Sequence, residues 1–173
     1  GKRPARALRD VLKYDGLYPD INRVTVLANN HDTDRFMSLV GADKASAKLH
    51  SAFILATRGI PQLYYGEEVL MKGGHDPANR ADMTKFDHSS RTADEQEMYD
   101  WTRRWIATRR QNPAMLTGRT IDILYNESVY AFRRVTAADD LLFIFNSSDR
   151  PQTVSFDRKE INAVDMGCYF DIL

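Results

Sequence analysis

Two short polar clusters contain the residues best suited to chemistry. His31, Asp32 and Asp34 form the first cluster. The second cluster lies about 45 residues further along the chain and contains His75, Asp76, Asn79 and Arg80. Carboxylates, a neutral histidine and an arginine are suited to binding a hydroxyl-rich ligand and to stabilising positive charge in an oxocarbenium-like transition state. The same residue types could instead hold a metal ion that activates water.

Three interpretations of these clusters stay open from residue types alone. The metal site is disfavoured because the loops contain only His31 and His75 as imidazole ligands, and because Arg35 and Arg80 would repel a cation. The plainest interpretation makes residues 30–34 a polar turn before the next helix.

The elements around the clusters favour a functional site. Residues 24–28 form a short apolar run typical of a strand buried on both faces, and residues 60–66 form a second strand. Between them, Asp43 can cap a helix that ends near Gly59. Strand, helix and strand in this order predict a βαβ unit, whose strands present their carboxyl ends at one edge, where parallel α/β folds place their sites.

Aromatic residues lie beside the polar loops. Tyr64, Tyr65 and Phe86 could stack on the apolar faces of sugars, although a core role is the simpler interpretation. We expect Tyr64 and Tyr65 to point to opposite faces of their strand. The adjacent carboxylates Glu67 and Glu68 diverge on an extended chain, so we assign them a structural or supporting role.

A long irregular loop and a long helix follow. Residues 73–90 are rich in Gly, Asp, Asn, Pro and Ser, and loops of this length are usually functional or disordered. Thr92 and Glu95 form a capping box for a helix that ends at Asn112 and Pro113. We expect its tryptophans to be core residues and four of its arginines to form a solvated face: Arg103, Arg104, Arg109 and Arg110.

The last third of the chain changes to strand patterns. The spacing of the apolar runs and of the intervening turns predicts an antiparallel meander or sandwich, with a domain boundary near residues 113–118. The expected strands are residues 121–125, 128–135, 141–145 and 153–156.

Composition narrows the remaining classes of protein. Lys and Arg number 24 and Asp and Glu number 24, so no net field attracts polyanions and nucleic acid is not expected as a partner. No apolar stretch approaches the roughly 20 residues that cross a bilayer, so we expect no membrane partner. The single cysteine, Cys168, excludes an internal disulfide framework and does not fix a compartment.

Three segments together resemble a known family. Residues 24–32, VTVLANNHD, resemble the strand-seven signature of the α-amylase family of glycoside hydrolases, and residues 59–68, GIPQLYYGEE, resemble its strand-eight signature. Residues 73–80, GGHDPANR, are similar to the following loop of neopullulanase, cyclomaltodextrinase and cyclodextrin glucanotransferase relatives.

This resemblance implies an α/β plus all-β fold. Residues 1–115 would form the C-terminal part of a (β/α)8 TIM barrel, namely strands 7 and 8 with their flanking helices. Residues 116–173 would form an incomplete antiparallel β-sandwich domain. The family's calcium sites usually lie in other parts of the enzyme, so we expect no cofactor in this chain and leave calcium open for the complete enzyme.

The resemblance also implies a role for each polar residue. Asp32 would be the third catalytic carboxylate, which distorts the sugar and stabilises the transition state without attacking it or donating a proton. His31 would bind the same sugar, and Asp76 and Arg80 would bind a sugar further toward the non-reducing side. The implied ligand is an α-glucan oligosaccharide.

The sequence departs from the family in one large respect. A retaining glycosidase needs a nucleophile and an acid/base carboxylate about 5 Å apart, and neither the strand-four nor the strand-five motif occurs among the 173 residues. We therefore expect a fragment that is inactive alone. The apolar runs at Val24 and Leu63 would be exposed, and the missing N-terminal part or self-association through barrel edges would cover them. The alternatives are a non-catalytic carbohydrate-binding or interaction module and, less favoured, a metallohydrolase fragment.

Overall fold

The computed structural model describes residues 5–157 and 159. Contacts along the chain divide it into two compact units. The first comprises residues 1–24, 57–59 and 108–173, and the second comprises residues 25–56 and 60–107.

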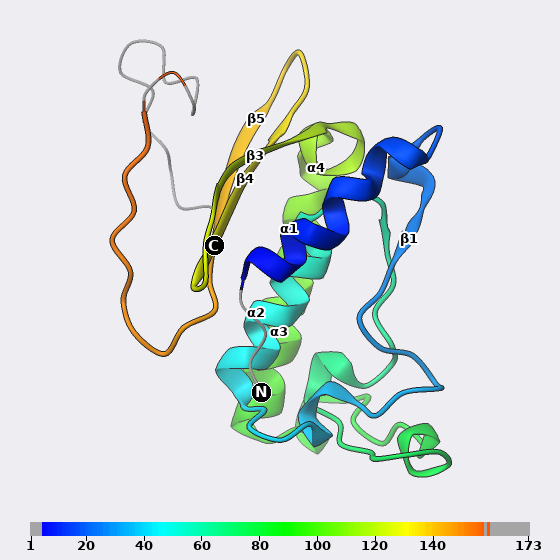
Figure 1. Ribbon diagram of the computed structural model, residues 1–173. Helices are drawn as coiled ribbons and strands as arrows, with labels where there is room; N and C mark the ends of the chain where they lie inside the picture. Colours follow the sequence, from blue (N-terminus) through cyan, green and yellow to red (C-terminus); the bar gives the residue numbers. More distant parts are fainter. Residues whose placement is uncertain (1–4, 158, 160–173) are drawn as a thin grey trace. The chain divides into compact units, whose positions relative to one another are not determined.

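The second unit contains the predicted strand–helix–strand arrangement. Strand β1 (Thr25–Val26) pairs in parallel with β2 (Ile60–Pro61), and helix α2 (Lys44–Ala56) lies between them in the chain (Figure 1). The amide of Gln62 donates to the carbonyl oxygen of Val26 at 2.9 Å, which extends the pairing past β2. Both strands therefore end at the same edge, just before the two polar loops.

Residues 24–28 are not buried on both faces, as their apolar pattern alone would favour. Part of this run is exposed instead, as we expect for a chain without the neighbouring strands. Thr25 and Ala28 are exposed, Leu27 is 41% exposed, and Val24 is half-buried. Within the described residues, β1 pairs only with β2. A strand is buried on both faces only when further elements cover it, and the described chain supplies too few of them.

Helix α2 begins with the cap that the sequence predicts. The Asp43 carboxylate accepts from the Ser46 amide at 2.7 Å, while the Ser46 hydroxyl accepts from the Asp43 amide at 2.9 Å. These two bonds satisfy donors that the first turn of a helix leaves free. The buried face of the helix includes Ala47, Ile54 and Leu55, at helical spacing.

Helix α3 (Ala93–Gln111) also begins at its predicted motif. The Thr92 amide donates to the Glu95 carboxylate at 2.7 Å, and the Glu95 amide donates to the Thr92 hydroxyl at 3.3 Å. Reciprocal bonds of this kind define a capping box, so the prediction is confirmed. The helix ends before Pro113, which cannot continue it.

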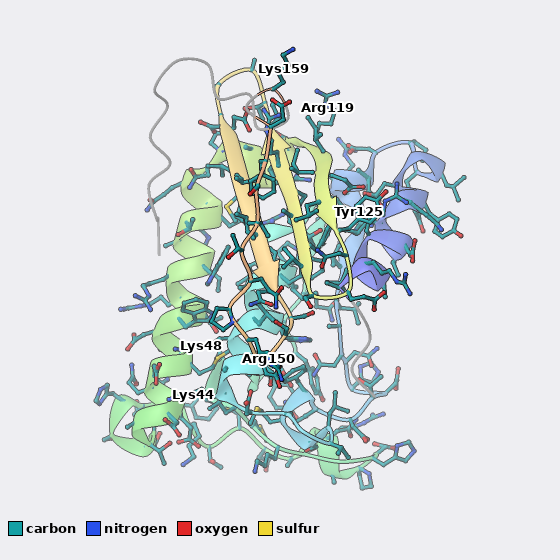
Figure 2. The ribbon with its side chains drawn as sticks, turned by 60° about the vertical axis from the view of Figure 1, so that its left-hand side comes forward. Lys44, Lys48, Arg119, Tyr125, Arg150 and Lys159 are labelled. Atoms are coloured by element: carbon teal, nitrogen blue, oxygen red, sulfur yellow. The ribbon has the colours of Figure 1, made fainter. Side chains whose placement is uncertain are left out.

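Helices α2 and α3 lie side by side in the second unit (Figure 1). The Trp101 indole donates to the carbonyl oxygen of Lys48 at 3.1 Å, and the Lys44 ammonium lies 2.6 Å from the Asp94 carboxylate. Glu97 pairs with both lysines, which Figure 2 labels on α2. These exposed ion pairs add little stability.

The loop of residues 73–90 is irregular, as predicted. Two short 3-10 turns interrupt it, Ala78–Arg80 and His88–Ser90. A third turn, Glu67–Val69, follows β2 directly.

The first unit is built on an antiparallel meander. Strands β3 (Arg119–Tyr125), β4 (Val129–Val135) and β5 (Asp140–Asn146) pair in chain order, with β4 in the centre and buried (Figure 1). Figure 2 labels Arg119 and Tyr125 at the two ends of β3. Helices α1 (Arg6–Leu12) and α4 (Pro113–Thr117) contact this sheet, and the turns Lys13–Leu17 and Ile21–Arg23 complete the unit.

One predicted strand is absent from the described part of the sheet. Residues 153–156 are irregular, because they make no ladder pairing within the described residues and apolar alternation alone does not make a strand. The meander is thus confirmed over three strands. The sandwich and the domain boundary between residues 115 and 116 stay predictions.

The predicted solvated arginine face of α3 is wrong at Arg109. This side chain is buried and donates to the carbonyl oxygens of Thr57, at 2.9 Å, and Gly59. The two carbonyl acceptors offset part of the cost of burying the guanidinium. Arg134 on β4 is also fully buried, and burial lowers its pKa to about 10.

Two sequence features concern the surroundings of the chain. None of the helices in the described residues combines the length and apolar character needed to cross a membrane. Cys168 lies outside the described residues.

Candidate active site

The loop after β1 is shaped by Asn30. Its side-chain oxygen accepts from the Asp32 amide at 2.9 Å, and the Asn30 amide donates to the Thr33 hydroxyl at 3.1 Å. An Asx turn of this kind reverses the chain within a few residues. It presents the Asp32 side chain at the carboxyl edge of β1.

The four residues predicted to form the site lie together. The Arg80 guanidinium is 2.7 Å from the Asp76 carboxylate and 3.5 Å from Asp32 Oδ1, and His31 Nε2 is 3.4 Å from the same Asp32 oxygen. The loop after β1 and the loop after β2 therefore contribute to one cluster, as the parallel pairing predicts. The side chains are 46% to 64% exposed.

This exposure matters for both energetics and chemistry. Ion pairs that contact water contribute about 1 kcal/mol or less, so these contacts do not fix the loops in place. The carboxylates and the guanidinium remain accessible to a ligand instead. Together they offer acceptors and charged donors, the groups that recognise sugar hydroxyls.

A second pair from the original clusters lies at the same edge. His75 Nδ1 is 3.6 Å from Asp34 Oδ1. The imidazole of His75 is almost fully exposed, so this contact is weak. We therefore do not add this pair to the four predicted site residues.

Arg35 is a supporting residue whose burial the sequence did not predict. Its side chain is fully buried, its guanidinium carbon lies 4.5 Å from the ring centroids of both Tyr64 and Tyr65, and it donates to the Tyr65 carbonyl oxygen. A guanidinium close to aromatic rings gains cation–π attraction in addition to packing. Arg35 therefore ties the loop after β1 to the chain after β2.

The two tyrosines correct a further expectation. Tyr64 and Tyr65 do not point to opposite faces, since both rings lie against Arg35 with their centroids 4.6 Å apart. Strand β2 ends at Pro61, so the alternation of a strand does not extend to these positions. The Tyr65 hydroxyl donates to the Ala81 carbonyl oxygen at 2.9 Å and so reaches the long loop.

Glu67 is a buried residue that contacts the chain leading into the site. Its carboxylate accepts from Asn29 Nδ2 at 2.8 Å and lies 3.9 Å from the Arg35 guanidinium. Burial is the largest influence and raises the pKa of Glu67, against the lowering effects of Asn29 and Arg35. These contacts agree with the structural role expected for this residue.

Asn79 is the second residue that sequence reasoning left without a role. It lies in the turn next to Arg80, is fully buried, and donates to the backbone of the loop after β1. Its position in a polar loop was the only available signal, because burial of a loop amide depends on contacts distant in sequence.

The geometry bears on the metal interpretation. Within the described residues, no group of three or more His, Cys, Asp or Glu side chains is arranged to hold a metal ion. Arg80 lies against both carboxylates of the cluster and supplies the positive charge there. The absence of a cofactor in this chain, and calcium in the complete enzyme, stay predictions.

Comparison with known proteins decides the family. Residues 12–118, more than half of the chain, match the alpha amylase catalytic domain. The chain belongs to this family. The resemblance read from residues 24–80 is therefore confirmed, and the alpha-amylase family is one of starch-acting glycoside hydrolases.

Individual relatives agree with the family. A cyclomaltodextrin glucanotransferase from Geobacillus stearothermophilus is 34% identical over 131 residues, which are 76% of this chain and 17% of that enzyme. The crystal structure of a gamma-CGTase from alkalophilic Bacillus clarkii is 31% identical, with a TM-score of 0.73 over 84% of this chain and 21% of that chain.

A more distant structure supports the fold alone. The alpha-amylase from Geobacillus thermoleovorans, complexed with acarbose, is 24% identical and has a TM-score of 0.80 over 91% of this chain and 36% of that chain. The small parallel and antiparallel sheets of this chain thus match parts of alpha-amylase family (β/α)8 enzymes. The chain spans about a fifth of the length of the cyclomaltodextrin glucanotransferases that it matches.

Proposed function

We propose that this chain supplies the transition-state-stabilising carboxylate and the donor-side sugar-binding residues of a retaining glycoside hydrolase that acts on α-glucans. The single cluster formed by Asp32, His31, Asp76 and Arg80 carries the proposal. Starch, maltodextrin, cyclodextrin and pullulan are the substrates of this class. The names of the relatives support the same class.

Each residue has a distinct role in this proposal. The negative charge of Asp32 stabilises the oxocarbenium-like sugar of the transition state, and its oxygens accept from the hydroxyls of that sugar. His31 bonds to the same sugar. Asp76 and Arg80, held 2.7 Å apart, bind the next sugars toward the non-reducing end as a matched acceptor and donor.

The bond-breaking groups would come from elsewhere in the complete protein. Retention requires a nucleophilic carboxylate and an acid/base carboxylate about 5 Å apart, and the 173 residues contain neither of the corresponding motifs. The proposal therefore includes that this chain is a fragment without turnover of its own. The full open reading frame tests this part directly, because it must encode the strand-four aspartate and the strand-five glutamate.

Replacing Asp32 tests its role in the complete protein. Asp32→Asn keeps the size of the side chain and removes its charge, so kcat for maltodextrin should fall at least about 100-fold. Asp149→Asn, which neutralises an exposed carboxylate after β5, is the matched control and should leave kcat unchanged. Near-parental turnover by folded Asp32→Asn would refute the catalytic role.

Turnover of maltodextrin and the complete sequence together distinguish the enzyme from a non-catalytic carbohydrate-binding module. A binding module would retain maltodextrin and release no reducing ends, and its complete sequence would lack the two missing carboxylates. The metallohydrolase fragment would instead need a stoichiometric metal in elemental analysis, with ligands from outside the described cluster.

A further inference from the structure

The side-chain amide of Asn79 is buried and bonds to the backbone of the loop that carries Asp32. Asn79 is fully buried, although its neighbour Arg80 is about half exposed. Asn79 Nδ2 donates to the carbonyl oxygen of His31 and to that of Thr33, each at 2.8 Å. These two carbonyls belong to the residues on either side of Asp32.

The chemistry of this contact requires a carboxamide. Two carbonyl oxygens are both acceptors, so the group between them must present two hydrogens, which the NH2 of asparagine supplies. An aspartate of the same shape would place an oxygen against two oxygens. Because the Asn79 side chain is fully buried, a replacement side chain that loses these bonds has no water to bond instead.

The position of Asn79 is itself fixed by backbone contacts. A Cβ at Gly73 would lie 2.5 Å from the Ala78 carbonyl oxygen and 2.8 Å from the Asn79 Cα, so the chain approaches there as closely as only glycine allows. The Arg35 amide donates to the Gly73 carbonyl oxygen at 3.0 Å. The loop after β2 is therefore held against both ends of the segment that carries Asp32.

We propose that Asn79 is the positioning residue for Asp32, because its amide clamps the backbone on both sides of the carboxylate and aligns the two sugar-binding loops. The role of Asp32 in this statement rests on the proposed function. The exposed ion pairs of the cluster are too weak to perform this alignment. The buried amide performs it in a place where substrate does not reach.

Two measurements on the complete protein test the clamp. Asn79→Ala removes both donors, and Asn79→Asp replaces them with acceptors. Amide hydrogen exchange of residues 29–35 should become at least about 10-fold faster in both variants, while exchange of the sheet residues 119–135 stays unchanged. For maltodextrin, kcat per folded molecule should fall at least about 10-fold, and KM should change less.

The pH dependence of amide protection in Asn79→Asp is a further test, because a general packing defect would not depend on the protonation of residue 79. A buried carboxyl has a raised pKa and, once protonated, donates one hydrogen bond. Relative to wild type at each pH, protection of residues 29–35 in Asn79→Asp should exceed that in Asn79→Ala at pH 5. At pH 8 it should fall below that in Asn79→Ala, because the ionised carboxylate repels the two carbonyl oxygens.

Asn126→Asp is the matched control. The Asn126 side chain is exposed and uses its oxygen to accept from the amides of Ser128 and Val129, a role that a carboxylate keeps. This variant should match wild type in exchange and in turnover.

The outcomes separate the two proposals. Unchanged exchange of residues 29–35 in both Asn79 variants would overturn the clamp, and so would loss of protection throughout the protein, because Asn79 would then hold the fold as a whole. If wild type shows no turnover of α-glucans, the proposed function fails while faster exchange confined to residues 29–35 still supports the clamp.

Discussion

The burial of a single residue of the second unit, His50, makes the stability of the protein depend on pH. Its ring lies against that of Phe36, tilted, with centroids 4.3 Å apart, and burial lowers the pKa of its imidazole to about 4 from the ordinary value of 6.5. The folded protein therefore keeps His50 neutral at pH values where the unfolded chain is already protonated. His50 contributes stability above pH 6.5 that is lost as pH falls toward 4.

Replacing His50 should remove this pH dependence. Between pH 6.5 and about 4, the wild-type free energy of unfolding should fall relative to His50→Gln by up to about 1.4 kcal/mol per pH unit. Urea unfolding at several pH values measures the difference. His88→Gln, at an exposed histidine, is the control, and equal pH slopes for wild type and His50→Gln would contradict the assignment.

At the scale of elements, the site depends on loops held by a few close contacts. Helices α2 and α3 end or begin at local caps, whereas the loops that carry Asp32 and Arg80 have no regular pairing of their own. Buried Arg35 and Asn79 join these loops to the chain after β2 and to each other. The precision of the cluster therefore depends on irregular segments and on the close approach at Gly73.

Adjacent glycines in this loop offer a matched test. Gly73→Ala places a Cβ 2.5 Å from the Ala78 carbonyl oxygen, whereas a Cβ at Gly74 meets nothing within 4 Å. Gly73→Ala should destabilise by about 1 to 3 kcal/mol and displace the turn that carries Asn79. Gly74→Ala should change stability by less than about 0.5 kcal/mol. Equal unfolding midpoints for the two variants would show that the loop relaxes freely.

At the scale of the whole molecule, the short parallel sheet leaves apolar surface exposed. Leu27 after β1 is 41% exposed and Ile60 in β2 is 54% exposed, and β1 has no second pairing partner within the described residues. Unpaired strand edges with apolar side chains favour association with other chains.

Self-association of the 173-residue chain should therefore depend on these positions. Leu27→Lys should reduce the weight-average mass measured by sedimentation or light scattering at high protein concentration, because it places a charge beside the open edge. Val11→Lys, at an apolar residue of α1 that is 68% exposed and so more accessible than Leu27, is the control and should have a smaller effect. A wild-type chain that stays monomeric at all concentrations would contradict this prediction.

Local patterns predicted the elements well and their burial poorly. The capping pairs Asp43–Ser46 and Thr92–Glu95 lie within four residues, so their sequence contains the whole interaction. Burial depends instead on what packs from elsewhere in the chain. This is why the expected exposure of Arg109 was wrong, and why the apolar pattern of residues 24–28 does not by itself bury them.

The sequence by itself determined the family, the order of strand, helix and strand, and the four polar residues of the candidate site, since motifs and helix caps are short-range patterns. Only the tertiary structure decided that Asp32, His31, Asp76 and Arg80 form one cluster and that Asn79 and Arg35 lie buried beneath it. The physical reason is distance along the chain: parallel pairing of β1 with β2 brings together loops more than 40 residues apart, and no local pattern encodes the contacts that result.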